Sequence, residues 1–302
     1  MKGTLIRLIN KLPYVRGLKS DVDQFKNSSA FSPGHFYSPL MDKAEIEKRQ
    51  DVIWARRDPA SIKAIDFNDD GQLALLREFK EFYKELPFSD DKKEELRYYY
   101  KNSFYSYSDA IVLYSMIRHF KPRQIIEVGS GFSSAVMLDT RDTLGRDIDL
   151  TFIEPYPDRL ETLLTPQDRP TTKILVKKVQ DVPLSEFQRL EANDILLIDS
   201  SHVGKTDSDL NYLLFEVIPS LNKGVLIHFH DILYPFEYHK DWVMKGFNWN
   251  EVYFVRALLM YNEVFQIRLF TSYMHEVHPE AFAEMPLYRQ NFGGNLWLQK
   301  MI

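Results

Sequence analysis

Four side chains in the second half of the chain could bind a metal ion or remove a proton. Asp199 and His202 follow one apolar segment, and His230 and Asp231 follow the next. Oxygen and imidazole ligands suit Mg²⁺, Mn²⁺ or a similar divalent ion, and such an ion lowers the pKa of a bound hydroxyl. Alternatively, an imidazole near its ordinary pKa can serve as a general base that a carboxylate orients. The sequence thus predicts proton removal that is assisted either by a metal or by a histidine.

The two alternatives share residues. The predicted metal ligands are Asp199, His230 and Asp231, and the predicted catalytic residues are Asp199, His202 and His230. A third alternative limits Asp199 to binding a cofactor amino group or capping a turn. His228 is expected to be a core residue with satisfied hydrogen bonds.

A glycine turn upstream is typical of a nucleotide-like cofactor site. An apolar run that ends at Glu127 passes into Gly129 and Gly131 and then into helix-forming residues. Glycines let the backbone approach a ligand closely, and the first N–H groups of a helix can bind an anionic group. Ser134 stands where the third glycine of the dinucleotide fingerprint would fall, so the turn disfavours a pyrophosphate.

Acidic residues after the next two apolar segments fit one nucleoside. Glu154 lies 23 residues after Gly131, where its carboxylate can accept hydrogen bonds from both ribose hydroxyls. The third segment ends in Gln180 and Asp181, and an acid there can accept from the exocyclic amino group of adenine.

In this order of motifs the chain resembles the class I S-adenosylmethionine-dependent methyltransferases, over about residues 104 to 302. The resemblance implies S-adenosylmethionine as the methyl donor. Metal-dependent members place acidic or amide ligands at the positions of Asp199, His230 and Asp231, so His230 departs from the pattern and argues against Mg²⁺ in particular. The cofactor-binding residues that the motifs and the resemblance indicate are Tyr107, Ser108, Glu127, Gly129, Ser130, Gly131, Ser133, Glu154, Pro155, Gln180, Asp181, Asp199 and Ser200.

The resemblance also implies the fold. Five strand-like segments alternate with helical ones, and two further strand-like segments, VFQIRLF and NLWLQKM, end the chain. We therefore expect an α/β, Rossmann-like, seven-stranded and mostly parallel sheet of order 3-2-1-4-5-7-6, with the last strand pair antiparallel and helices flanking it.

Composition narrows the class of protein. A chain of 302 residues with 44% apolar content can bury a large core as one domain plus an extension. The absence of cysteine excludes disulfides and thiolate metal sites, and the net charge of −5 argues against a nucleic-acid partner. No apolar run approaches the roughly 20 residues of a transmembrane helix, and no signal-peptide pattern follows the N-terminus. These features predict a cytoplasmic protein.

Two zones precede the methyltransferase-like region. Residues 1–20 are basic and amphipathic, so they could lie on an anionic membrane surface. A short docked helix or a frayed tail is favoured, because Pro13 and Gly17 are expected to cut the stretch short. Residues 21–103 are expected to form a mainly helical, aromatic extension, with a helix before Pro87. By resemblance the extension caps the cofactor and shapes the acceptor pocket; alternatively, its aromatic rings only pack it onto the domain.

Aromatic residues after the fifth strand-like segment suggest a flat or hydroxylated acceptor. The predicted substrate-binding residues are Tyr37, Tyr234, Phe236, Tyr238 and Trp242. The predicted function is O-methylation of a small molecule, such as a sugar or natural-product intermediate. An NAD(P)-type oxidoreductase and a non-catalytic nucleoside-binding module remain alternatives, and a homo-oligomer remains open.

Overall fold

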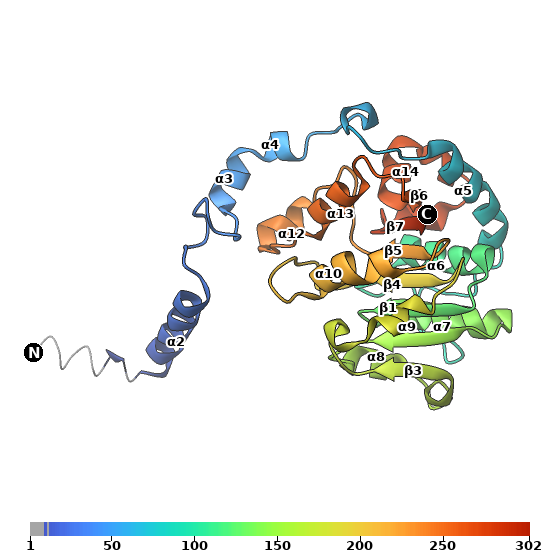
Figure 1. The fold of residues 1–302 in the computed structure, drawn as a ribbon, viewed down its shortest axis with the longest axis horizontal. Coiled ribbons are helices and arrows are strands. Elements are labelled where there is room, and N and C mark those ends of the chain that lie inside the picture. The colour runs from blue at the N-terminus through green and yellow to red at the C-terminus, as the bar shows by residue number, and fades with distance from the viewer. Residues whose placement is uncertain (1–8, 11) are drawn as a thin grey trace, which may run out of the picture. The chain divides into compact units, whose positions relative to one another are not determined.

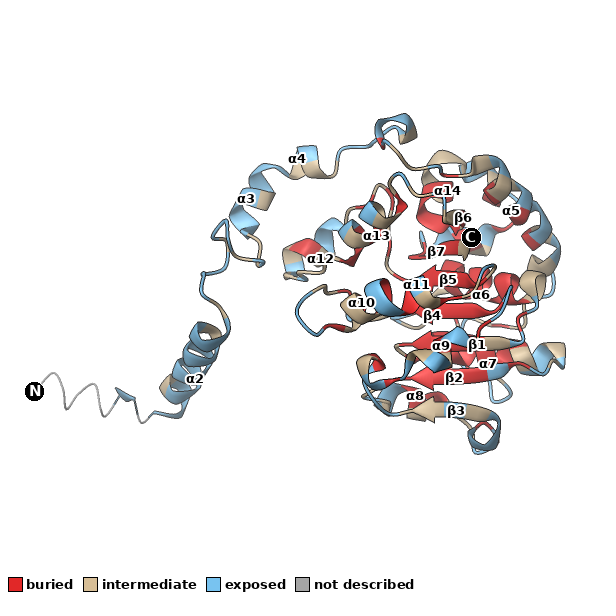
Figure 2. Cartoon of the chain, viewed as in Figure 1, coloured by how far each residue is buried: buried red, intermediate tan, exposed pale blue. Residues whose placement is uncertain are grey.

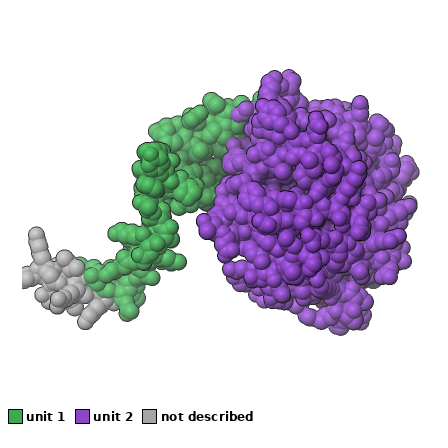
Figure 3. Space-filling view, in the orientation of Figure 1, with its two compact units in different colours: residues 1–56, 240–248 green, residues 57–239, 249–302 purple. Residues whose placement is uncertain are grey.

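The chain consists of two compact units, seen in a computed structural model that describes residues 9, 10 and 12–302 (Figure 3). The first unit comprises the described part of residues 1–56 together with 240–248, and the second comprises residues 57–239 with 249–302. The predicted boundaries after residues 20 and 103 do not coincide with this division. The assignment of residues 21–103 as a cap stays a prediction.

The first unit is helical. Its helices are α2 (Pro13–Ser28), α3 (Lys43–Lys48), α4 (Gln50–Ile53) and α12 (Lys240–Lys245), labelled in Figure 1. The prediction that Gly17 cuts the amphipathic stretch short is wrong, since α2 runs through it, whereas Pro13 does mark a helix boundary. Pro13 begins the helix, where a missing N–H removes no hydrogen bond, and an interior glycine costs only about 1 kcal/mol.

The basic segment of residues 1–20 is described only in part. Lys2, Arg7 and Lys11 lie outside the described residues, as do Leu5 and Ile6. Within the part of the chain that is described, no helix is long and apolar enough to cross a membrane. Contact of this segment with a membrane surface stays a prediction.

The second unit contains the predicted helix before Pro87. It is α5 (Asp69–Tyr83), and it buries Leu75, Leu76 and Phe79 along one side. Apolar residues three or four positions apart lie on the same face of a helix, which explains why this stretch is helical and docks on the core.

The sheet of the second unit confirms the expected fold. Its strands are β1 (Gln124–Val128), β2 (Asp149–Ile153), β3 (Thr172–Leu175), β4 (Ile195–Ile198), β5 (Leu226–Phe229), β6 (Phe265–Phe270) and β7 (Leu296–Lys300). They are ordered β3-β2-β1-β4-β5-β7-β6. β7 pairs antiparallel with both β5 and β6, and the other pairs are parallel.

Helices connect these strands. The α-helices are α6 (Tyr107–Phe120), α7 (Phe132–Leu144), α8 (Asp158–Leu163), α9 (Leu184–Gln188), α10 (Asp209–Tyr212), α11 (Ile218–Ser220), α13 (Glu251–Leu259) and α14 (Thr271–Val277). A π-helical turn, η4 (Leu213–Val217), joins α10 to α11. The 3₁₀ turns are η1 (Pro59–Ser61), η2 (Arg169–Thr171), η3 (Val179–Asp181), η5 (Pro279–Phe282) and η6 (Pro286–Gln290).

The central strands form the core, and every residue of β4 and β5 is buried (Figure 2). Continuous apolar runs are typical of strands that are covered on both faces. His228 of β5 lies in this core, 4.6 Å from the ring of Trp297 and 5.7 Å from that of His230, centroid to centroid. Neither ring nitrogen of His228 has a hydrogen-bond partner among the described residues. The expectation of burial is confirmed, whereas no protein group among the described residues supplies the expected hydrogen bonds.

One end of the sheet is held by polar side chains of the α5 region. β6 is the outermost strand there, and its register with β7 shifts between Ile267 and Leu269. Asn68 donates a hydrogen bond from Nδ2 to the carbonyl of Ile267 at 2.8 Å, and the Phe270 N–H donates to Oε1 of Gln72 at 2.6 Å. These two bonds engage backbone groups near the irregularity in β6.

Candidate functional site

The candidate site lies at the carboxyl ends of β1, β4 and β5. The order in which successive strands are added to the sheet reverses at β1: β2 and β3 lie on one side of it, and β4 and β5 lie on the other. In open α/β sheets a ligand crevice forms at such a point. The loops that leave these strands carry Gly129, Asp199 and His230.

The glycine turn is shaped first by the sheet itself. Gly129 has φ = 83°, and a Cβ there would stand 1.8 Å from the carbonyl oxygen of Asp199. Gly129 is therefore required by the close approach of the chains that leave β1 and β4. From the sequence, we expect a glycine here because the backbone approaches a ligand closely. In the structure, the backbone of Asp199 is already close enough to require a glycine at this position.

Glu127 ties β1 to α7. Its two carboxylate oxygens accept hydrogen bonds from the hydroxyls of Ser133 and Ser134, and Ser134 Oγ also accepts from the Gly131 N–H. Burial raises the pKa of Glu127 to about 8, although the two serines oppose the rise. Ser134, which replaces the third glycine of the dinucleotide fingerprint, therefore accepts a hydrogen bond from the backbone at the start of α7 and links that start to Glu127.

The predicted ribose-binding residue Glu154 lies beside the glycine turn. Glu154 follows β2, and its carboxylate accepts from the backbone N–H groups of Ser130 at 3.1 Å and Tyr156 at 2.8 Å. The hydroxyl of Ser130 is buried and has no partner among the described residues. Pro155, beside Glu154, is half-buried.

The remaining predicted cofactor residues are more dispersed. In η3, Gln180 donates from Nε2 to the Asp207 carbonyl at 2.8 Å, and Asp181 is exposed. At the start of α6, Tyr107 donates to Asp90 at 3.0 Å, and the buried Ser108 donates its N–H to Asn291 at 2.7 Å. The Ser200 Oγ accepts from the His202 N–H at 3.4 Å. The cofactor contacts of these residues stay predictions.

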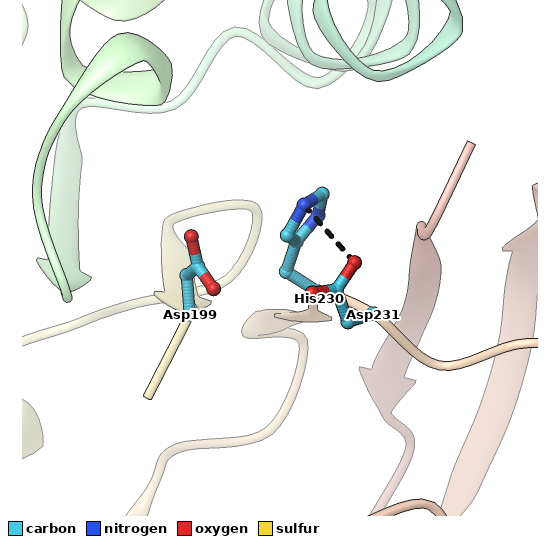
Figure 4. A group of neighbouring side chains, drawn as sticks. All are labelled: Asp199, His230 and Asp231. Carbon is cyan, nitrogen blue, oxygen red and sulfur yellow. Dashed lines mark ion pairs between the residues drawn. The ribbon is translucent and has the colours of Figure 1, made fainter. Parts of the chain in front are cut away.

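The structure brings Asp199, His230 and Asp231 into one group (Figure 4). Each offers one ligand atom, and these atoms all lie within 4.8 Å of one another. His230 Nε2 is 3.5 Å from Asp231 Oδ1, while its Nδ1 is buried without a partner among the described residues. Burial alone would lower the pKa of His230, but Asp231 and Asp199 raise it. The four side chains lie close together as predicted, because His202 also reaches the group.

His202 stands beside both carboxylates. Its Nε2 is 3.4 Å from Asp199 Oδ1 and 3.7 Å from Asp231 Oδ2, and its Nδ1 is 2.7 Å from Glu251 Oε2. Burial opposes a charge on His202, but hydrogen bonds to Asp199 and Glu251 raise its pKa well above the usual value. Burial would raise the pKa of Asp199, yet His230 and His202 lower it.

Three residues beside this group are not among the predicted site residues. Glu251 lies 49 residues from His202, so no local spacing connects them. Tyr105 places its ring 5.0 Å from that of His230, and its buried hydroxyl has no partner among the described residues. Asp109 accepts from the Gly294 N–H at 2.8 Å. An acid in the first turn of an otherwise apolar helix was the available signal for Asp109.

The predicted acceptor-binding aromatics have structural partners of their own. Phe236 is 1% exposed, and its ring lies 5.4 Å from that of Phe270. The hydroxyl of the buried Tyr234 donates to the Arg57 carbonyl at 2.7 Å, and that of Tyr238 accepts from the Val252 N–H at 3.2 Å. Tyr37, which is exposed, and Trp242 of α12 belong to the other unit. Core packing therefore accounts for the three residues after β5, and their acceptor role stays a prediction.

Aromatic rings before α6 lie against the start of α7. Phe104 stacks on Phe132 with ring centroids 5.9 Å apart, and the Arg159 guanidinium lies 3.6 Å from the Phe104 ring centre. A Cβ on Gly131 would stand 3.1 Å from Cδ of Arg159. This group, formed by Phe104, Phe132 and Arg159, borders the glycine turn.

Comparison with known proteins agrees with this fold. A family model described as a methyltransferase domain matches residues 126–232. An uncharacterized protein of Archaeoglobus fulgidus is 32% identical over 196 residues, which cover 64% of this chain and 86% of that protein.

Similar solved structures were also found. The O-methyltransferase TomG of Streptomyces achromogenes, involved in tomaymycin synthesis and crystallised with SAM, is 13% identical over 87% of this chain and all of its own, with a TM-score of 0.41. The plantazolicin methyltransferase BpumL, with a substrate analogue and SAH, is 15% identical over 78% of this chain and all of its own, with a TM-score of 0.44. A Podospora anserina methyltransferase with SAH is 14% identical over 76% of this chain and 88% of its own, with a TM-score of 0.42.

The family-model match falls on β1 through β5, and the strand order is that of a Rossmann-like methyltransferase sheet. This chain belongs to the class I S-adenosylmethionine-dependent methyltransferases.

Proposed function

We propose that the protein transfers the methyl group of S-adenosylmethionine to a hydroxyl of a small molecule, with a divalent metal at Asp199, His230 and Asp231 and with His202 receiving the proton. The observation that carries the proposal is the convergence of these four side chains beside the turn that follows β1.

The turn after β1 supports binding of the cofactor. Glu154 presents a carboxylate whose present partners are only backbone N–H groups, and Ser130 has a buried hydroxyl without a partner among the described residues. The hydroxyls of a ribose could donate hydrogen bonds to the Glu154 carboxylate, and the polar end of the cofactor could accept one from the Ser130 hydroxyl. When bound, S-adenosylmethionine supplies a sulfonium that carries an electrophilic methyl group.

The donor set also supports a metal. Two carboxylates and one imidazole suit Mn²⁺ or another first-row ion better than Mg²⁺, which prefers oxygen ligands. Nδ1 of the buried His230 has no partner among the described residues, so no hydrogen bond at that nitrogen competes with an ion. Such an ion would lower the pKa of a hydroxyl that binds it.

The remaining groups of the site would handle the acceptor proton. His202 Nε2 faces the two carboxylates at 3.4 and 3.7 Å, so it stands next to the place where a hydroxyl bound between them would release its proton. Without a metal, and against the effect of burial, the carboxylates of Asp199 and Glu251 raise the pKa of His202. A divalent ion held by Asp199 would offset the negative charge beside the ring and so favour neutral His202, which can accept a proton. Proton transfer to a placed histidine typically contributes 10²–10⁴-fold in rate. The burial of His202 and His230 keeps water away from this step. A sugar or natural-product hydroxyl remains the proposed acceptor class.

Calorimetry tests the cofactor first. S-adenosylmethionine and S-adenosylhomocysteine should bind and NADH should not, and Glu154→Ala should weaken binding by about 1–3 kcal/mol through lost charge-assisted hydrogen bonds. Tight binding of NADH with no binding of either sulfur compound would support the oxidoreductase alternative and refute the proposal.

A Mn²⁺ titration of the cofactor-bound protein tests the metal. One site per chain should appear, should be lost in Asp199→Asn and Asp231→Asn, and should persist in Asp207→Asn, which alters an exposed carboxylate outside the group. If the wild type binds no Mn²⁺, Zn²⁺ or Co²⁺, the metal is excluded and His202 alone carries the proton removal.

A further inference from the structure

The loop that carries His202 rests on the first residues of α13, and one of the contacts between them reaches the His202 ring itself. We propose that Glu251 is a positioning residue for His202, holding its Nδ1 so that Nε2 faces Asp199 and Asp231. This inference rests on the proposed function, in which His202 receives the acceptor proton.

The distances show which contact orients the ring. Nδ1 of His202 lies 2.7 Å from Glu251 Oε2, which is a normal length for a charge-assisted hydrogen bond. Nε2 lies 3.4 and 3.7 Å from the carboxylates of Asp199 and Asp231, which is longer than a good hydrogen bond. Glu251 therefore fixes the ring through Nδ1, whereas Nε2, which faces Asp199 and Asp231, makes no close hydrogen bond to either carboxylate.

Both partners are shielded from water. The side chain of His202 is 7% exposed and that of Glu251 is 1% exposed. Oε1 of Glu251 has no partner among the described residues, so the whole buried carboxylate makes a single side-chain contact. A buried charge is costly unless it is paired, and here the pairing is with His202.

The backbone holds the same two residues together. His202 has φ = 60°, and its carbonyl accepts from the N–H groups of Asn250 at 3.0 Å and Glu251 at 3.1 Å. The first N–H groups of a helix lack partners within it, so the turned carbonyl of His202 satisfies donors at the start of α13.

Neighbouring side chains leave little room for another position of the ring. The ring of Trp249 lies 4.5 Å from that of His202, centroid to centroid. Two positions beyond His202, Gly204 donates its N–H to Asn250 Oδ1 at 2.6 Å, and Asn250 Nδ2 donates back to the Gly204 carbonyl at 3.2 Å. These bonds hold the loop without touching the imidazole, so they provide a matched control for the role of Glu251.

A purely structural role makes a different prediction. An acid in the first turn of α13 also stabilises the helix through its dipole. In that case removal of Glu251 would lower stability in the same way as removal of Asn250, and the state of the His202 ring would not change.

NMR of protein labelled with ¹⁵N in its histidine rings separates the two roles. The His202 signals are identified by their loss in His202→Gln. We expect a downfield Nδ1–H proton in the wild type, whatever the charge on the ring, because a carboxylate accepts from it. The signal should vanish in Glu251→Ala, should move upfield but persist in Glu251→Gln, and should stay in place in Asn250→Ala.

Several outcomes would overturn the inference. They are a signal that is unchanged in Glu251→Ala, or one that is lost equally in Asn250→Ala. Should Glu251→Ala fail to fold, Glu251→Gln carries the test, and an unchanged shift there refutes the role. The measurement needs neither acceptor nor metal. Cofactor calorimetry on the same samples shows separately whether the proposed function holds.

Discussion

At the scale of single residues, Gly129 shows how the sheet constrains the site. It combines φ = 83° with a virtual Cβ 1.8 Å from the Asp199 carbonyl oxygen. Gly145, at the end of α7, has φ = 57° and nothing within 4 Å of a virtual Cβ. The two glycines share a left-handed conformation and differ in the space around them.

This difference gives a paired prediction. Gly145→Ala should lose only about 1 kcal/mol of unfolding free energy, the cost of a left-handed conformation. Gly129→Ala should lose at least about 3 kcal/mol or fail to fold, because the methyl group meets backbone that cannot move aside. Urea unfolding of both variants measures the losses, and equal values would show that crowding by Asp199 is unimportant.

Glu127 links stability to pH. Its pKa in the folded protein is about 8, above the usual value for a carboxyl group, because the residue is buried. The unfolded chain therefore releases this proton at lower pH than the folded one does. The contribution of Glu127 to stability should fall as the pH rises from about 4.5 to 8, with a slope of at most ~1.4 kcal/mol per pH unit, and level off above.

Glu127→Gln, which keeps the shape but cannot ionise, should lack this decline. Melting temperatures of wild type and variant at several pH values between 4 and 9 measure it. Parallel curves for the two proteins would mean that Glu127 has an ordinary pKa in the folded state.

At the scale of elements, the segment before α6 is anchored to α7 by one arginine. Arg97 donates to Asp139 at 2.8 Å and, through Nε, to Asp168 at 2.9 Å, and its backbone N–H also donates to Asp139. Both carboxylates are almost completely buried. This anchor sets the path of the segment that ends in Tyr105, beside His230.

Arg97→Ala should therefore destabilise the protein by about 3–5 kcal/mol, because two buried carboxylates lose the guanidinium group that neutralises them. Lys84→Ala, which removes an exposed pair with Glu81, should cost less than about 0.5 kcal/mol. Chemical unfolding compares the two. A loss near that of Lys84→Ala would show that Arg97 is not the anchor.

The comparison of sequence and structure also belongs to this scale. The group of Asp199, His202, His230 and Asp231 could be predicted because all four residues lie in the loops that follow β4 and β5, and these parallel neighbours end at the same edge of the sheet. Glu251 could not, since only the packing of α13 brings it to His202. Phe236 was assigned to an acceptor site because an aromatic residue after a strand fits a pocket or a core equally well, and burial, which decides, is invisible in one sequence.

At the scale of the whole molecule, the strand order could be predicted because a family resemblance supplied it; periodicity alone would not have placed β7 between β5 and β6. The division into units could not be predicted, since residues 240–248 join the first unit from a distant part of the chain. That pairing depends on tertiary contacts such as the Met41 N–H bond to Asn248 at 3.2 Å.

The two ends of the chain should differ in their importance for folding. α2 buries no residue, whereas β7, the last strand, lies inside the sheet. Deletion of residues 1–28 should shift the melting temperature by no more than about 2 °C. For a chain of this size, that shift corresponds to a change in unfolding free energy of less than about 1 kcal/mol. Deletion of residues 298–302 should abolish cooperative melting. A large shift from the first deletion would show that α2 packs onto the rest of the protein.

The hydrogen bonds from Asn68 and Gln72 to β6 have a consequence for the behaviour of the protein at high concentration. An outermost strand whose backbone groups are unused can recruit a strand from another molecule and start a growing aggregate. Here two side chains from the α5 region occupy such groups at the register shift of β6. At the opposite end, β3 is four residues long, and lysines lie within it and just after it. Short length and positive charge deter the same pairing. Both ends of the sheet thus carry features that oppose edge-to-edge association, one through side-chain hydrogen bonds and the other through charge.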